Sequence, residues 1–355
     1  MYKNPKLTFL ILLLILILNG LNNSPAYSKS QKNTNFNKSG VNLFSTDEMI
    51  NICIETDIDY LLNNRCENCT YQNAKLFYLD KHDCSKISLN IKVKPRGHFR
   101  LNPKYCEFPP LKIKFLDTNI KDTLFKNQTT LKLVTHCNGE NYILQEYLIY
   151  KQYNIFTDFS FKVRLAEITY IDTKGNYEPF TNYGFFIEKT KHMASRNNAV
   201  NVSVDKVDKD LLNYNYTTLI YLFEYMIGNN DWDIDLGKNF KFLYSDDSKS
   251  YIPVPYDFDL AHIINPDYPN LSDIYGNEKI EKPKFRKLRR NKNELTAVFN
   301  IFKYNKNNIF DLYSRFPYLN YYKEKEIIDY YKQFCKEIRR KRLIKKIFIY
   351  SDKKK

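Results

Sequence analysis

Glycine is scarce in this chain, with only nine in 355 residues. The sequence therefore has no glycine-rich loop of the kind that cradles phosphates. The G-x-S-x-G motif is also missing, so a hydrolase with a nucleophile elbow is not predicted. Cys66 and Cys69 form a C-x-x-C pair, but there is no second such pair and no histidine at zinc spacing. These absences argue against a zinc knuckle.

Long apolar runs are absent after the N-terminus. Lys3 and Lys6 precede LTFLILLLILIL, a run too short to cross about 30 Å of hydrocarbon, and the small residues of AYS follow at a cleavage-like distance. We predict a signal peptide over residues 1–28 and an exported protein, whether periplasmic, cell-surface or secreted. An uncleaved N-terminal anchor is the alternative. Residues 29–45 are polar, which predicts a disordered linker.

Positive charge is in excess, at +15 net. Much of it lies in KPKFRKLRRNK (Lys282–Lys292) and in a basic C-terminal helix and tail predicted over residues 321–355. Summed charge of this kind attracts nucleic acid, anionic lipid or acidic polymers. An exported protein does not meet its own genome, so nucleic acid is not the expected partner. We expect an acidic protein or an anionic envelope polymer, while a merely solvated helix face is the alternative.

Seven cysteines follow the signal peptide, which permits up to three disulfides with one thiol left over. A loop disulfide between Cys66 and Cys69 is one option, and pairing of either residue with Cys84 is another. Cys106 and Cys137 flank two strand-like segments, so a bridge between adjacent strands is plausible. The connectivity stays open at the level of sequence.

Strand-like segments dominate residues 46–190. They alternate or run apolar and are broken by Asp, Asn, Pro and Gly: AKLFYLD, ISLNIKVKPRG, PPLKIKF, TTLKLVTH, FKVRLAEITYID and NYGFFIEKT. One helical segment, NGENYILQEYLIYKQYNIF, interrupts them, with Asn141 as a candidate cap. We predict an N-lobe made of an antiparallel sheet with one helix.

Residues 191–320 become helical. KDLLNYNYTTLIYLFEYMIG has an apolar helical face and stops at Gly228, and NELTAVFNIFKYN and EKEIIDYYKQFCKEIRRKRLIKKIFIY follow as further helices. No Gly/Ser linker separates the halves. The predicted fold is therefore α+β, with a β-rich N-lobe and a mainly helical C-lobe in one domain.

Two acidic segments stand in the C-lobe. Asp231 and Asn239 lie in IGNNDWDIDLGKNFKFLY, and Asp257 and Asp259 lie in IPVPYDFDLAHI. A strand from Asn239, a turn at DDS and a returning strand predict a hairpin that brings the acidic ends together. Oxygen ligands of this kind suit Mg²⁺ and phosphate, with a separate Asp as base. A solvated or calcium-binding turn, or a decayed active site, is the alternative.

The chain resembles the CotH family of secreted, atypical protein kinases and, more distantly, HipA-like kinases. The likeness runs from about Arg96 to Asp259 and rests on KPRGHFR, FPPLKIKF, YGFFIE, GNNDW with KNFKFLY, and PVPYDFD. It implies a two-lobed, atypical protein-kinase-like fold. It also implies an exported phosphotransferase that uses ATP with Mg²⁺ or Mn²⁺ on a protein or envelope component. A non-catalytic binding or adhesion protein on the same fold is the alternative.

The resemblance implies a metal site and a base. Asp257 matches the family's metal-binding Asp, and Asn239 and Asp259 complete the expected metal ligands. Asp231 is the expected general base. The Asp-to-Asn spacing is longer here than in the usual catalytic loop, so Asp235 is an alternative base.

Nucleotide contacts are expected from the N-lobe. One of Lys112 and Lys114, which share a strand face, would contact phosphates and pair with Glu146, and Lys114 is preferred. Arg96 and Arg100 bracket a glycine turn where two guanidinium groups could grip phosphate oxygens. The strand that ends in Glu188 would lead to the hinge between the lobes.

Overall fold

The computed structural model describes residues 42–81, 83–116, 120–137, 139–264, 288–290, 292–339 and 348–349. The predicted signal peptide and most of the predicted polar linker lie outside these residues. So do most of Lys282–Lys292 and most of the basic C-terminal tail.

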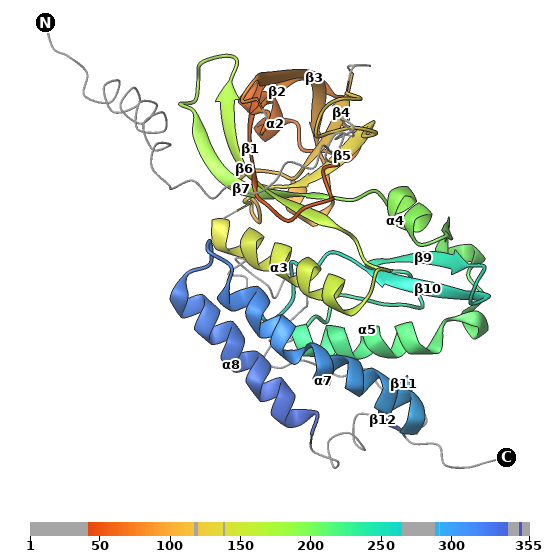
Figure 1. Ribbon diagram of the computed structural model, residues 1–355. Helices are drawn as coiled ribbons and strands as arrows, with labels where there is room; N and C mark the ends of the chain where they lie inside the picture. The colour runs from red at the N-terminus through yellow and green to blue at the C-terminus, as the bar shows by residue number, and fades with distance from the viewer. Residues whose placement is uncertain are drawn as a thin grey trace, which may run out of the picture. The chain divides into compact units, whose positions relative to one another are not determined.

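A closed seven-stranded barrel occupies the first half of the described chain (Figure 1). Around the barrel the strand order is β1-β2-β3-β4-β5-β7-β6, and only β1 and β6 pair in parallel. The strands are β1 (Ile50–Thr56), β2 (Gln72–Leu79), β3 (Lys86–Pro95), β4 (Leu111–Phe115), β5 (Thr130–Val134), β6 (Val163–Asp172) and β7 (Phe180–Ile187). Two short helices, α2 (Ile58–Asn63) and the 3₁₀ turn η1 (Phe99–Leu101), lie in the connections.

The α+β class is confirmed, but the prediction of a plain antiparallel sheet is wrong. The strand INICIET was not predicted, although its residues alternate between buried positions and exposed or half-buried ones. This strand, β1, pairs with β2 on one side and with β6 on the other, which closes the sheet into a barrel. Closure removes both sheet edges.

Gly184 on β7 is required by the close packing at this closure. A Cβ built there would lie 2.8 Å from the backbone oxygen of Val134 and 2.9 Å from Cδ1 of Ile168. Any side chain would therefore push β7 away from β5 or β6, its two neighbours in the barrel.

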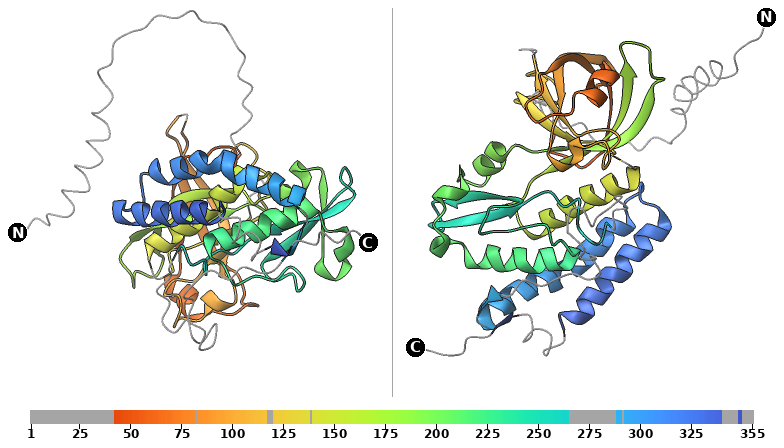
Figure 2. Two further views of the ribbon diagram at one scale, coloured as in Figure 1. Left: turned by 90° about the horizontal axis from the view of Figure 1, so that it is seen from below. Right: turned by 180° about the vertical axis from the view of Figure 1, so that it is seen from behind.

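The long helix α3 (Glu140–Phe156) joins the barrel to the helices (Figures 1 and 2). It contacts β6 and β7 on one side and α7 on the other. Its N-cap is Gly139 rather than the expected Asn141. One apolar core includes residues of α3, α5, α7 and α8 together with Val163 and Phe185 of the barrel, so α3 belongs as much to the helical half as to the barrel.

The second half is mainly helical, with a small sheet of order β10-β9-β8. The elements are α4 (Thr190–Arg196), β8 (Ala199–Val202), η2 (Val204–Lys206), η3 (Lys209–Leu211), α5 (Tyr214–Ile227), β9 (Phe240–Ser245), β10 (Ser250–Pro255), β11 (Leu288–Arg289), α7 (Lys292–Ser314), α8 (Tyr321–Glu337) and β12 (Phe348–Ile349). Helix α5 ends as predicted at Gly228, whose φ of 71° is the left-handed conformation that glycine favours. Helix α8 stops at Glu337, earlier than predicted, and Phe348–Ile349 pairs with β11 instead.

Two cysteine pairs are disulfide-bonded, Cys66–Cys69 and Cys106–Cys137. The free cysteines among the described residues are Cys53, Cys84 and Cys335. In the part of the chain that the structure describes, no helix combines the length and apolar character needed to cross a bilayer.

His136 makes the barrel acid-sensitive. Its ring stacks on Phe108 at 5.1 Å, its buried Nδ1 has no hydrogen-bond partner, and burial lowers its pKa from 6.5 to about 4. The pKa of His136 is lower in the folded protein than in the unfolded chain, so protonation of the ring favours unfolding. The contribution of the neutral ring to stability is complete above the unfolded-state pKa and is lost as the pH falls through the folded-state pKa. We expect the free energy of unfolding to drop by about 3 kcal/mol between pH 6.5 and pH 4 for a shift of this size.

Replacing His136 by Phe should flatten this pH dependence while keeping the stacked ring. Urea unfolding at pH 7, 5.5 and 4 would measure it. Parallel stability curves for wild type and His136→Phe would show that another group causes the acid loss.

Candidate active site

The β9–β10 hairpin brings the two acidic segments together, as predicted. Phe240 lies opposite Pro255, and one residue further out the backbone N–H of Tyr256 donates to the carbonyl oxygen of Asn239 at 3.0 Å. Asn239 and Asp257 both adopt left-handed backbone conformations, with φ of 60° and 67°. Asn and Asp tolerate this region better than most residues, but it still costs free energy, and such strain gathers at functional sites.

Asp231 lies directly against Asn239. The Asn239 amide nitrogen donates to the Asp231 backbone oxygen at 2.6 Å and to its Oδ2 at 3.1 Å, while Lys238 forms an ion pair with Oδ1. The loop is held because the Asp231 N–H donates to the buried Asn229 side chain at 2.9 Å. Asp235, the alternative base, is exposed and pairs with Lys209 instead. The geometry therefore groups Asp231, not Asp235, with Asn239.

Asp257 presents an open carboxylate. Its backbone N–H donates to the hydroxyl of buried Tyr150 on α3 at 2.9 Å, which fixes the main chain. Its side chain is exposed and makes no hydrogen bond or ion pair with any described residue. This carboxylate is available to a ligand.

Asp259 has a different environment. Its Oδ2 accepts from Arg100 Nε at 3.0 Å, and Arg100 Nη2 donates to Glu146 Oε2 at 2.7 Å, with all three side chains at least nine-tenths buried. Burial raises the pKa of both Glu146 and Asp259, and the Arg100 charge opposes this by favouring the ionised carboxylates. Asp259 is thus placed in an internal ion pair. The described residues that follow, up to Ile264, form turns and an irregular position, so Asp259 caps no helix within them.

Glu146 accordingly pairs with Arg100 rather than with a lysine of β4. Lys114 is exposed and Lys112 is half-buried, and neither forms an ion pair with a described residue. The barrel lysine on which the Asp257 charge acts is Lys132 on β5, directly opposite Lys112. Sequence reasoning missed it, although TTLKLVTH is the strand that immediately precedes α3.

Cations from both lobes surround Tyr256 and Asp257. The Lys132 and Lys241 ammonium groups lie 5.9 Å and 5.2 Å from the centre of the Tyr256 ring. Lys132 is reachable by solvent yet surrounded by protein, and burial together with Arg96 and Lys241 lowers its pKa to about 8. Burial lowers the pKa of Arg96, and the Asp257 carboxylate opposes this. Arg96 makes no side-chain hydrogen bond or ion pair with a described residue.

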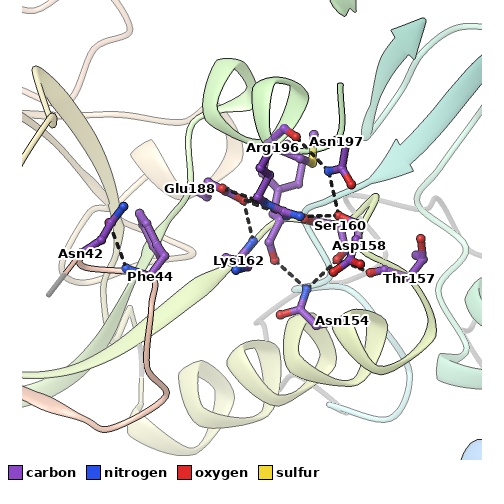
Figure 3. Close-up of polar contacts among 12 residues, drawn as sticks. Asn42, Phe44, Asn154, Thr157, Asp158, Ser160, Lys162, Glu188, Arg196 and Asn197 are labelled. Carbon is purple, nitrogen blue, oxygen red and sulfur yellow. Dashed lines mark hydrogen bonds and ion pairs between the residues drawn. The ribbon is translucent and has the colours of Figure 1, made fainter. Parts of the chain in front are cut away.

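Glu188 is buried and used within the protein (Figure 3). It accepts from Arg196 Nε at 3.0 Å and from the Lys162 backbone N–H at 3.1 Å. Arg196 also donates to the carbonyl oxygen of Asp158 at 2.7 Å. The carboxylate therefore ties the end of β7 to α4 and to the segment after α3, rather than pointing to a ligand.

No group of three or more His, Cys, Asp or Glu side chains in the described ranges could hold a metal ion. Mg²⁺ does not require such a group, because one or two carboxylates usually bind it together with substrate phosphates and waters. Asp257 offers a free carboxylate. Asn239 donates through its amide nitrogen, so its Oδ1 remains open. Both oxygens are of the kind that Mg²⁺ binds, whereas the Asp259 carboxylate is occupied by Arg100.

Removing Arg100 should leave two buried carboxylates without a partner. We expect Arg100→Met to lower the free energy of unfolding by about 3–5 kcal/mol at pH 7. Arg315→Met is a suitable control, since Arg315 and Asp311 form an exposed i,i+4 pair worth about 0.5 kcal/mol or less. Glu146→Gln should lower the free energy of unfolding less in the Arg100→Met background than in wild type. Chemical denaturation measures both losses, and equal losses in the two backgrounds would contradict an interaction between Arg100 and Glu146.

Comparison with known proteins finds no matching family model and no matching curated protein. Among solved structures, the chain is similar to the crystal structure of a Helicobacter pylori proinflammatory kinase, CtkA. The alignment has a TM-score of 0.37 and 12% identity and covers 63% of this chain and 90% of that chain. A similarity this weak carries no conclusion about activity, and the CotH resemblance has no family match behind it.

Proposed function

We propose that this protein is an exported, CotH-like phosphotransferase on a two-lobed, kinase-like fold. It transfers the terminal phosphoryl group of ATP to a hydroxyl of a protein or envelope component, with Mg²⁺ or Mn²⁺. The observation that carries the proposal is one end of the β9–β10 hairpin, where the Asn239 amide contacts Asp231 and the open carboxylate of Asp257 follows the opposite strand. Cations of the barrel, Arg96 and Lys132, lie in electrostatic range of Asp257.

The donor end of the site combines metal and phosphate contacts. Asp257 and the Oδ1 of Asn239 would hold the divalent ion, which neutralises charge on the phosphate oxygens when bound. Lys132 and Arg96 would bind phosphate oxygens directly. Catalysis of this type consists of positioning and charge stabilisation, and these side chains lie on strand ends and a barrel turn that hold them in place.

Asp231 would accept the proton of the acceptor hydroxyl as the oxygen attacks the phosphorus. Asn239 and Lys238 orient its carboxylate. The P–O bond to the leaving ADP breaks as the bond to the acceptor forms, so no covalent enzyme intermediate is needed.

Export is supported by the N-terminal apolar run and by the two disulfides, since such bonds persist in oxidising compartments. An acidic or envelope acceptor would fit the net positive charge.

A non-catalytic binding protein on the same fold is the second candidate. The observation that favours it is the internal ion pair between Asp259 and Arg100. Because of this pair, Asp257 is the one carboxylate of the DFD segment that is open to a metal ion. Such a protein would bind an anionic ligand without transferring phosphate.

Asp257→Asn should separate these candidates. The amide suits the left-handed backbone and replaces an exposed group, so the stability should stay within about 0.5 kcal/mol of wild type. Metal-dependent transfer of labelled phosphate from ATP to a protein acceptor should fall by about 100-fold or more. Asp247→Asn, at the other end of the same hairpin, should match wild type. Equal, metal-independent labelling by wild type and Asp257→Asn would exclude the phosphotransferase.

Lys132 should give the activity an alkaline limit. With a pKa of about 8, its ammonium is charged below that pH and neutral above it, so kcat/KM should decline as the pH rises through 8. Lys132→Arg should move the decline to higher pH. Lys132→Met should lower kcat/KM by about 10- to 100-fold at pH 7, the usual scale for a charged hydrogen bond, and Lys114→Met should have a smaller effect. A larger loss for Lys114→Met would identify the β4 lysine as the phosphate contact.

A further inference from the structure

A cluster of cations, wider than the phosphate contacts proposed above, lines the region between the barrel and the β9–β10 hairpin. We call it the cation cluster; it comprises Arg96, Lys112, Lys132, Lys189 and Lys241. The members come from the β3–β4 connection, β4, β5, the end of β7 and β9. The positive charges act on one another. Burial is the largest cause of the lowered pKa of both Lys132 and Lys189, and the charge of Lys112 lowers both further.

The cluster has little internal compensation. None of its side chains forms an ion pair with a described residue. Asp257 acts on both Arg96 and Lys132, and Glu146, which is already bound to Arg100, also acts on Arg96. Lys189 donates to the hydroxyl of Thr129 at 2.6 Å, which is a neutral partner. Lys112 and Lys132 are directly opposite each other on neighbouring strands, a placement that destabilises a sheet when the charges are alike. Folding alone gives no reason for this arrangement, and an anionic ligand would relieve it.

The side chains of the cluster are all cationic, and the aromatic ring that two of them contact in the described part of the chain is that of Tyr256. Small-molecule pockets are lined mostly by apolar and aromatic groups. Here the half-buried Lys112 and the exposed Lys132 occupy facing outward positions of β4 and β5, and Lys189 follows the end of β7. Tyr256 offers an aromatic ring, but the ammonium groups of Lys132 and Lys241 already lie over it.

We infer that the cation cluster recognises its phosphoryl donor by the charge of an oligophosphate chain, and that the base contributes little. The inference rests on the proposed function, since it names the donor feature that the same site selects. Lys112 and Lys189 extend the anion site beyond Arg96 and Lys132. An inorganic tripolyphosphate should therefore occupy the site nearly as well as a nucleoside triphosphate.

Binding to the full mature chain, measured by calorimetry at fixed ionic strength without acceptor, tests this. We expect the Kd values for ATP, GTP and tripolyphosphate to agree within about threefold, and adenosine to give no binding in the millimolar range. Lys112→Met and Lys189→Met should each raise the Kd for tripolyphosphate by about 10-fold, the scale of a lost charge-assisted contact. Lys92→Met is the matched control, because Lys92 is a half-buried lysine on neighbouring β3 outside the cluster, and it should change the Kd by less than about twofold.

Three results would overturn the inference. The first is that adenosine binds as tightly as ATP. The second is that Lys92→Met raises the Kd for tripolyphosphate as much as Lys112→Met does. The third is that polyglutamate binds more tightly than tripolyphosphate at equal charge. The last result would make the cluster a docking surface for an acidic protein. Because binding is measured without transfer, an intact tripolyphosphate site with no kinase activity would refute the proposed function alone.

Discussion

The ion pairs of Arg100 are the interaction on which the rest of the site depends. One guanidinium from the β3–β4 connection bonds both to Glu146 of α3 and to Asp259 of the segment after β10. Three parts of the chain are joined there, and the joint is buried. A buried charge without a partner is costly, so the two carboxylates and the guanidinium hold one another to a single arrangement. Asp257 lies two residues from Asp259, and its main chain is held by Tyr150, one turn further along α3 from Glu146.

A second contact reinforces the same junction. The Cys106–Cys137 disulfide connects the β3–β4 segment with the residues just before α3. Leu260, next to Asp259, packs against these two cysteines. Covalent, ionic and apolar contacts thus converge on the connection that carries Arg96 and Arg100. The position of the cations relative to Asp257 follows from this joint.

Charge is segregated around the junction. Glu146, Asp259 and Arg100 lie on the inner side and form ion pairs with one another, while Asp257 remains open beside the cation cluster. Charges in buried ion pairs stabilise the fold, whereas cations that form no ion pair can bind an anionic ligand. Glu188 follows the same rule, because its carboxylate is bound to Arg196 and serves the connection between β7 and α4.

Local features could be predicted from the order of the residues alone. Alternating residues predicted β2 to β7, Gly228 marked the end of α5, and a turn of polar residues predicted the hairpin that joins Asn239 to Asp257. These features depend on contacts between residues close in the chain, and local patterns report them. The remaining features depend on how distant segments pack together. Barrel closure needs β1 beside β6, and Arg100 reaches Glu146 and Asp259 across 46 and 159 residues. Lys132 and Lys241 meet at Tyr256 from different lobes. Residue patterns along a chain do not encode which distant charges become neighbours, because that is set by how the lobes pack.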